Sequence, residues 1–214
     1  MMLDRRAAAA MLLEAARLLE ENADRLSEID SRFGDGDHGI TMNKIARLIR
    51  ERVPAWGDRS IHTFLDDLGM AVMEVKGGSA GPLYGTLISG LGAALGEEEN
   101  ELEEDGVRRM FAGMLEELGD LTTAGVGDKT MMDALIPAAE AAQKTEGGIA
   151  VILEEAAAAA EAGARASEGF VAKFGRARSY KEQTIGTPDA GAVSASLFIR
   201  GMAKGFGSLQ DKEK

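Results

Sequence analysis

The sequence contains no cysteine, only four prolines and two histidines, and just 5% of its residues are aromatic. Without cysteine the chain cannot form disulfides, thiolate zinc sites, iron–sulfur clusters or a cysteine nucleophile. Basic residues are also scarce, since 24 Lys and Arg residues face 36 Asp and Glu residues and leave a net charge of −12. Because this charge repels nucleic acid and anionic lipid, and no basic patch offsets it, we expect neither nucleic-acid nor membrane partners.

A long apolar run is missing as well. Near the N-terminus, Arg5 and Arg6 precede an apolar stretch that ends at Glu14, with no cleavage site before further charges. This pattern indicates a cytoplasmic protein that begins with a helix rather than a signal peptide. With 214 residues, 45% of them hydrophobic, the chain is long enough to form one globular domain over residues 1–214. We expect its last residues, 208–214, to fray.

Runs of alternating β-branched and aromatic residues are absent, so the sequence predicts no sheet. Strong helix formers instead fill the stretches between glycine clusters, and Leu12, Ala16, Leu19, Ala23 and Leu26 follow helical spacing. The expected fold is all-α, with eight helices. Their predicted ranges are residues 3–29, 39–52, 59–75, 80–95, 102–120, 128–144, 148–171 and 190–206.

Short connections favour antiparallel neighbours, so we expect an up-and-down bundle or barrel. In that topology the first, third, fifth and seventh connections lie at the same end. These are residues 30–38, 76–80, 121–128 and 172–190, and they hold nearly all of the unusual local sequence. The coincidence predicts a binding site at that end, because loops on a rigid scaffold are where binding groups gather. At the opposite end, Trp56 and His62 are expected to pack or cap.

The first of these loops carries Asp30, Asp35 and Asp37 among glycines. Three carboxylates on a tightly folding loop suit a hard cation such as magnesium or calcium. An EF-hand does not fit, because Ala46 stands where it needs a bidentate Glu, and magnesium, which keeps waters and shares its shell with phosphate oxygens, suits a sparse set of three carboxylates better. A helix predicted to begin at Gly39 would direct its free N–H groups toward an adjacent phosphate. The alternative is that one aspartate caps this helix and the others are solvated turn residues.

The other three loops are less specific. Residues 77–85 place small residues before a helix and could lie against a phosphate or an adenine ring. The GDKT segment at residues 127–130 lacks the longer glycine-spaced run and preceding strand of a phosphate loop, and Asp128 could simply cap a helix. The long connection before the last helix contains Arg176, which could clamp phosphate or form a surface salt bridge.

Together these four loops resemble the nucleotide-binding L subunit of dihydroxyacetone kinases over nearly the whole chain. The matching segments are IDSRFGDGDHGITMN, GGSAGPLYG, GVGDKTMMDALIP and GRARSYKEQTIGTPDAGA. The resemblance implies an eight-helix antiparallel barrel that holds a nucleotide in the loops at one end. It implies two Mg²⁺ ions held by Asp30, Asp35 and Asp37, and a catalytic role for Arg176. The nucleotide contacts that it implies are His38, Gly39, Ile40, Thr41, Ser79, Ala80, Met131, Arg176, Asp189, Ala190 and Gly191.

The function implied by the resemblance is phosphoryl transfer from bound ATP, or through bound ADP, to a short-chain ketose such as dihydroxyacetone. The ketose would be held by a separate K subunit. In the phosphotransferase-linked version an M subunit rephosphorylates ADP that stays bound, whereas an ATP-exchanging kinase is equally compatible with these residues. Two alternatives are a fatty-acid-kinase-like domain and a nucleotide-binding regulator that acts on a transcription factor.

Overall fold

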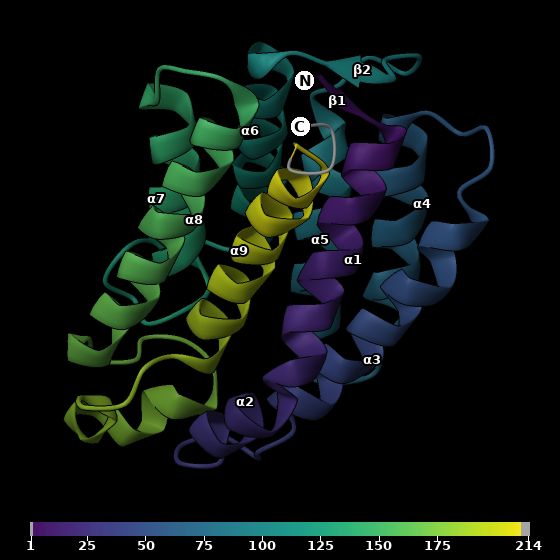
Figure 1. The fold of residues 1–214 in the computed structure, drawn as a ribbon. Coiled ribbons are helices and arrows are strands. Elements are labelled where there is room, and N and C mark those ends of the chain that lie inside the picture. The colour runs from purple at the N-terminus through teal and green to yellow at the C-terminus, as the bar shows by residue number, and fades with distance from the viewer. Residues whose placement is uncertain (1, 211–214) are drawn as a thin grey trace.

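The structure, a computed structural model, describes residues 2–210 and is almost entirely helical (Figure 1). An antiparallel pair of two-residue strands, β1 (Leu3–Asp4) and β2 (Glu101–Leu102), lies at one end. The helices are α1 (Arg5–Glu21), α2 (Ala23–Asp30), α3 (His38–Arg52), α4 (Ile61–Met73), α5 (Ala80–Ala93), α6 (Glu104–Leu121), α7 (Met132–Lys144), α8 (Ile149–Ala166) and α9 (Ala190–Gln210). Three 3-10 segments, η1 (Val53–Ala55), η2 (Ser167–Gly169) and η3 (Arg176–Thr184), complete the described elements.

The all-α prediction is confirmed, with differences at several boundaries. The first predicted helix is broken at Asn22, whose side-chain amide donates to the Leu18 carbonyl (2.8 Å) and ends α1. The structure also contains the short strand pair, which was not predicted because two-residue strands are too short to show a periodic pattern in the sequence. At the other end of the chain, α9 continues to Gln210, into the segment expected to fray, and residues 211–214 lie outside the described part.

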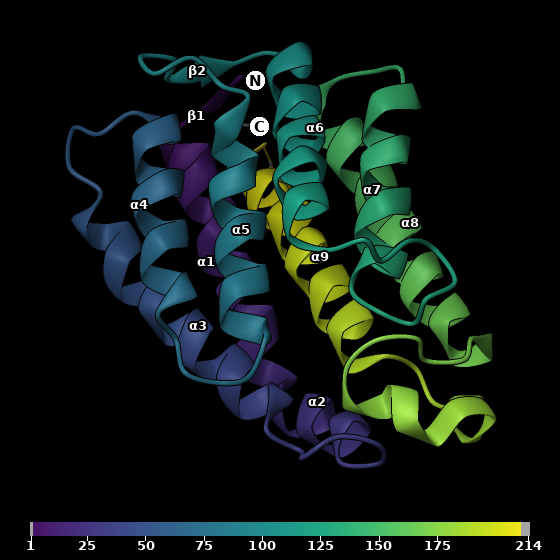
Figure 2. The same cartoon turned by 180° about the vertical axis from the view of Figure 1, so that it is seen from behind.

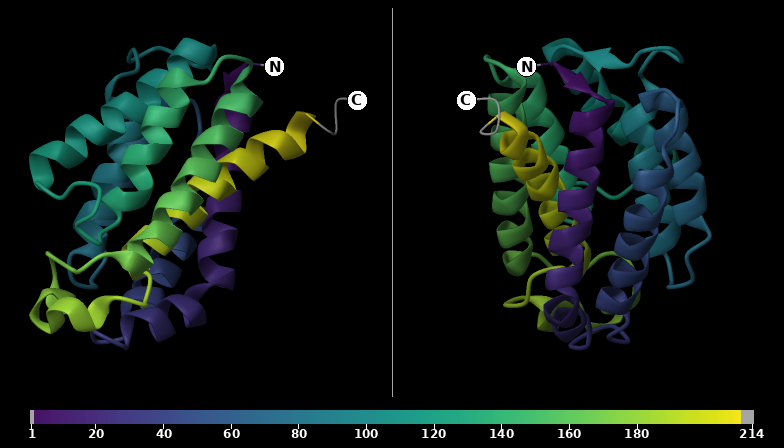
Figure 3. Two further views of the ribbon diagram at one scale, coloured as in Figure 1. Left: turned by 90° about the vertical axis from the view of Figure 1, so that its left-hand side faces the viewer. Right: turned by 45° about the vertical axis from the view of Figure 1, so that its right-hand side comes forward.

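The long helices form a closed ring. Helix α1 packs between α3 and α9, and α8, α7, α6, α5 and α4 follow in order around the barrel (Figures 1 and 2). Two further views show the helices running along the barrel, with α2 at the end opposite the strands (Figure 3). This order is the up-and-down arrangement predicted from the short connections.

Small residues allow some neighbouring helices to approach very closely. A Cβ at Gly163 of α8 would lie 1.8 Å from the Asp133 carbonyl oxygen of α7. At Gly201 of α9 it would lie 2.3 Å from the Cα of Ala15 in α1. Larger residues line the interior, where the rings of Phe64, Phe111 and others are buried. Each such side chain stabilises the fold by about 1.5–3 kcal/mol.

The end that carries the strands behaves as expected. Trp56 stacks on Phe64 with ring centroids 3.8 Å apart and donates its indole N–H to the Arg59 carbonyl (2.9 Å). His62 forms a hydrogen bond through Nδ1 to the Gly92 carbonyl (3.0 Å). Both residues therefore pack and bond within the fold, as the sequence suggested. Within residues 2–210, no helix combines the length and apolar character that crossing a membrane requires.

Candidate functional site

A cavity of about 600 Å³ opens at the end of the barrel opposite the strands. Its walls come from the α2–α3 loop, the α4–α5 loop with the first turn of α5, the α6–α7 connection and the segment that leads into α9. These are the four connections that the sequence analysis placed at the same end of the bundle. The prediction that they meet at one end is therefore confirmed.

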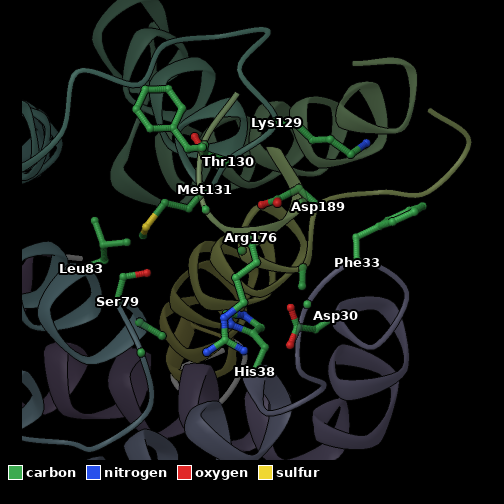
Figure 4. A pocket seen from close by; sticks show the side chains of 18 of the residues that line it. Asp30, Phe33, His38, Ser79, Leu83, Lys129, Thr130, Met131, Arg176 and Asp189 are labelled. Carbon is green, nitrogen blue, oxygen red and sulfur yellow. The ribbon is translucent and has the colours of Figure 1, made fainter. Parts of the chain in front are cut away.

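The cavity has an apolar side and a charged side. In Figure 4, Leu83 and Met131 lie on one side, whereas Asp30, His38 and Arg176 lie on the other. Further apolar lining comes from Leu121, Phe174 and other side chains. A ligand with one flat apolar portion and one anionic portion would match both sides, as most small-molecule sites combine apolar walls with a few placed polar groups.

Three aspartates converge on the charged side. Asp30, Asp35 and Asp37 each offer a carboxylate oxygen, and these oxygens lie within 4.8 Å of one another. The loop wraps around Asp30, whose Oδ2 accepts the Gly36 N–H at 2.8 Å, and a Cβ at Gly34 would lie 2.3 Å from its Oδ1. Asp37 precedes α3 but makes no side-chain capping bond, so the capping alternative does not account for its carboxylate. This donor set fits a hard divalent cation.

Arg176 crosses from η3 to this cluster and forms an ion pair with Asp35. Desolvation works in the opposite direction, but the hydrogen bond and charge of Arg176 lower the pKa of Asp35. Burial, followed by the charge of Asp35, raises the pKa of Asp37. The neighbouring carboxylates thus disfavour a second negative charge on one loop, which is the situation that a bound cation relieves.

His38, at the start of α3, joins the charged side to α9. Its Nε2 bonds to Ser194 Oγ at 2.8 Å, and that hydroxyl donates to the Gly191 carbonyl at 3.0 Å. Burial lowers the pKa of His38, although the charge of Asp30 opposes this shift. The ring therefore stays neutral near pH 7 while it lines the cavity.

The next three positions of α3 do not line the cavity. Gly39 packs on α2, since a Cβ there would lie 1.8 Å from the Ala23 carbonyl oxygen. Ile40 is 56% exposed. Thr41 is buried, and its Oγ1 has no hydrogen-bond partner among the described residues. Of the implied nucleotide contacts at residues 38–41, only His38 lines the cavity, next to the aspartates.

The remaining expected contacts do line the cavity, namely Ser79, Ala80, Met131, Arg176, Asp189, Ala190 and Gly191. Asp189 caps α9, since its Oδ2 accepts the Ala192 N–H at 2.7 Å. Burial raises the pKa of Asp189 to about 7. Asp128, in contrast, does not cap α7, which begins at Met132; its carboxylate accepts the Gly125 N–H and pairs with Lys173.

Several lining residues escaped the sequence analysis. Phe33, Tyr84, Lys129 and Phe174 all border the cavity. Aromatic residues and a lysine beside a glycine turn are too common to mark a site by themselves. The one available signal was position, because each lies within or next to one of the four loops.

Comparison with known proteins identifies this architecture. The model of the DAK2 domain matches residues 32–204. The chain belongs to the DAK2 domain family. The resemblance to the L subunit, drawn from the four loops, is thereby confirmed, as is the helical fold.

Curated relatives include two of similar length. The ADP-binding subunit DhaL of the PEP-dependent dihydroxyacetone kinase of Escherichia coli K12 is 31% identical over 196 residues, which cover 90% of this chain and 92% of that protein. A corresponding subunit of kinase 2 from Listeria innocua is 32% identical, with 88% and 89% covered.

Longer proteins contain a similar region. L-erythrulose kinase of Pectobacterium atrosepticum is 33% identical over 89% of this chain but only 33% of its own length. Among solved structures, the dihydroxyacetone kinase of C. freundii in complex with AMP-PNP and Mg²⁺ aligns with a TM-score of 0.65 and 25% identity. That alignment covers 92% of this chain and 33% of the kinase, so the chain spans about a third of it.

Proposed function

We propose that this chain is the subunit of a ketose kinase that binds ADP or ATP together with Mg²⁺, and that it works with a separate subunit holding the ketose. Dihydroxyacetone or a related short-chain ketose would receive the phosphoryl group. Support comes from the family membership and from the E. coli relative, which matches nearly end to end and is described as ADP-binding. This chain would then supply the nucleotide-binding part of the kinase.

One observation carries the proposal. Three carboxylates converge beside the start of α3, Arg176 lies across from them, and an apolar wall faces both within one cavity. A nucleotide presents the same division, since its base is flat and largely apolar and its polyphosphate is anionic. In a protein of net charge −12, a bound cation would offset the repulsion of such a ligand, and the aspartate cluster would supply the ligands for that cation.

In this proposal Asp30, Asp35 and Asp37 hold the metal. When bound, Mg²⁺ would supply the positive charge that offsets the phosphate charge. Arg176 would exchange its ion pair with Asp35 for contact with the transferring phosphoryl group, where a guanidinium stabilises developing charge. His38, neutral and hydrogen-bonded to Ser194, would present a fixed ring to the phosphate region. No general base is assigned to this chain.

Finer features remain part of the proposal. We propose that Asp30, Asp35 and Asp37 together would hold two Mg²⁺ ions. Similarity that extends over most of two PEP-dependent subunits favours the phosphotransferase-linked version, in which an M subunit rephosphorylates bound ADP. Exchange of ADP for ATP is the alternative donor route.

The first test measures nucleotide directly. Purified protein is denatured and the released nucleotide identified by chromatography, and ADP binding to stripped protein is followed by calorimetry with and without Mg²⁺. We expect stoichiometric nucleotide or Mg²⁺-dependent binding. Asp35→Asn should abolish nucleotide retention with unchanged helix content, whereas the control Asp67→Asn, in an exposed pair with Arg59 on α4, should retain it. Normal nucleotide retention by Asp35→Asn would contradict the metal site and favour the alternative that these aspartates are solvated turn residues.

A second test concerns the acceptor. Phosphorylation of dihydroxyacetone and erythrulose is measured with a K subunit and either ATP or a phosphorylated M subunit. Turnover with only one donor assigns the donor route. Absence of turnover with both donors, in protein that binds Mg-ADP, would contradict the kinase function and favour the regulatory alternative.

A further inference from the structure

Lys129 is a buried lysine that the proposed chemistry does not use. It is 5% exposed and borders the cavity. It belongs to the GDKT segment, which superficially resembles a phosphate-binding loop. The side chain does not serve a phosphate in this structure. Its Nζ donates to the Ser167 carbonyl at 2.6 Å and to the Thr187 carbonyl at 2.5 Å. In Figure 4 the side chain extends away from Arg176 and His38.

These two carbonyls belong to segments that meet at the beginning of α9. Ser167 follows α8 as the first residue of η2, and its Oγ accepts the backbone N–H of Asp189 at 2.9 Å. Thr187 lies two residues before Asp189, the residue that caps α9. Lys129 therefore joins the α6–α7 loop, the end of α8 and the start of α9 through one ammonium group.

The backbone at Lys129 adds an independent observation. Its φ is 60°, in the left-handed region where a glycine is favoured and a lysine is disfavoured. Asp133 holds this turn, since its carboxylate accepts the N–H groups of Gly127 (2.6 Å) and Thr130 (2.7 Å). A lysine at such a position destabilises the backbone, so the contacts of its side chain must offset the strain.

Charge also favours a cation at this point. Burial lowers the pKa of Lys129, whereas the charges of the Asp189, Asp133 and Glu168 carboxylates act in the opposite direction. An apolar side chain would leave the carbonyls without a donor and the buried Asp133 without a nearby cation. Both consequences are costly inside a protein.

We propose that Lys129 is a positioning residue that fixes residues 187–191 against the α6–α7 loop and thereby sets how long the nucleotide stays bound. This inference rests on the proposed function, because the fixed segment contains Asp189, Ala190 and Gly191 of the expected site. Lys129 itself does not touch the nucleotide. It holds two of the four loops at the spacing that the ligand needs.

The test compares Lys129→Gly, Lys129→Arg and Lys173→Met with the wild type. Lys129→Gly removes the side chain and relieves the backbone strain, whereas Lys129→Arg keeps the charge and the donors. Lys173→Met is the matched control: Lys173 joins the same two segments through its pair with Asp128, but its side chain is 60% exposed and the pair is expected to contribute little.

Two measurements are made on each protein well below its Tm. Without nucleotide, hydrogen exchange of peptides covering residues 182–192 should be faster in Lys129→Gly than in the wild type. With Mg-ADP, dissociation should be roughly tenfold to hundredfold faster, as expected for the loss of hydrogen bonds to a charged group. Lys129→Arg should recover part of both effects, and Lys173→Met should match the wild type.

Other outcomes would overturn the inference. A lower Tm with unchanged exchange and unchanged Mg-ADP dissociation would make Lys129 a merely structural residue. Normal exchange combined with a loss of affinity for ADP but not for AMP would instead assign it a direct phosphate contact. If the wild type binds no nucleotide, the proposed function fails and with it the nucleotide role of Lys129, while the exchange data still report whether the loops are joined.

Discussion

The two ends of the barrel differ in how their charged groups find partners. At the end with the strands, Arg109 makes a two-pronged ion pair with Glu99, with distances of 2.6 and 3.0 Å. At the cavity end, Asp30, Asp35 and Asp37 cluster together, and Arg176 forms an ion pair with Asp35 of this cluster. Unpartnered buried atoms do not follow this division, since both Thr41 Oγ1 and Asn100 Oδ1 lack partners within the described chain. The difference lies in arrangement, since Glu99 already has its partner in Arg109, whereas the clustered aspartates offer converging carboxylate oxygens that a cation could bind.

Backbone strain shows the same contrast. Two described residues other than glycine have positive φ, Lys129 at 60° and Lys181 at 50°, and both lie in connections at the cavity end. Strained backbone persists where the surrounding contacts enforce it, which is typical of functional loops. The turns of the opposite end reach positive φ with Gly57 and Gly147, which bear no such cost. The cavity end is therefore the region where the backbone gives up some stability in loops that form the binding site.

The largest effect that would sharpen this contrast is expected from Asp37→Asn. Loss of one carboxylate from the cluster should weaken Mg²⁺-dependent ADP binding by roughly a hundredfold or more, because even outer partners of a metal contribute up to that factor. Calorimetry with ADP at fixed Mg²⁺ measures it. Asp67→Asn, outside the cluster, should bind as the wild type does. Equal affinities for all three proteins would remove Asp37 from the site.

A smaller loss is expected from Arg176→Gln. The ion pair with Asp35 is exposed, so the fold should tolerate the change, and circular dichroism and Tm should stay near those of the wild type. Affinity for a non-hydrolysable ATP analogue with Mg²⁺ should fall roughly tenfold to hundredfold, since the guanidinium contact with the transferring phosphoryl group is lost. Arg176→Lys should restore part of it. If affinity rises instead, Arg176 competes with the cation for Asp35 rather than contacting phosphate.

Asp189→Asn should change the pH dependence of stability. Burial raises the folded pKa of Asp189 from 3.8 to about 7, so between these values the folded protein holds a proton that the unfolded chain lacks. The contribution of Asp189 to stability therefore falls as pH rises through that window. Asn keeps a capping oxygen but does not titrate. Denaturant unfolding should show the variant gaining about 1 to 2 kcal/mol on the wild type between pH 4 and pH 7.5. If the difference in the free energy of unfolding between the variant and the wild type did not change with pH, the raised pKa of Asp189 would be contradicted.

The smallest effect is expected at the opposite end. The hydrogen bond from Arg109 lowers the pKa of Glu99, so the pair contributes above the usual pKa of 4.5 and its contribution is lost as pH falls through the folded value. Because the pair is partly exposed, Glu99→Gln should cost under about 1 kcal/mol at pH 7 and leave Mg-ADP affinity unchanged. Urea unfolding and calorimetry measure both. A loss of nucleotide affinity would mean that the two ends are coupled.

Much of the fold followed from local sequence. Helix formers between glycine clusters gave the all-α fold, and short connections gave the order of helices and the end at which the four loops meet. The break at Asn22 was missed because Leu19, Ala23 and Leu26 keep helical spacing across it. The strand pair was missed because its pairing joins residues nearly a hundred positions apart and only two per strand.

The site was predictable where one loop carried its own chemistry and less so where contacts come from distant segments. Asp30, Asp35 and Asp37 lie within eight residues, and the structure brings them together as expected. Lys129 gains its meaning only from carbonyls 38 and 58 positions away, which no local pattern reveals. Ile40 points outward for a similar reason, because the packing of Gly39 on α2 fixes the rotation of α3.

A crystal structure of the wild-type protein grown with excess Mg²⁺ and ADP tests the central claim most directly. The account predicts metal density among Asp30, Asp35 and Asp37, with the polyphosphate beside the start of α3 and the base against the apolar wall near Leu83 and Met131. An empty cavity, or aspartates turned outward into solvent under these conditions, would contradict it.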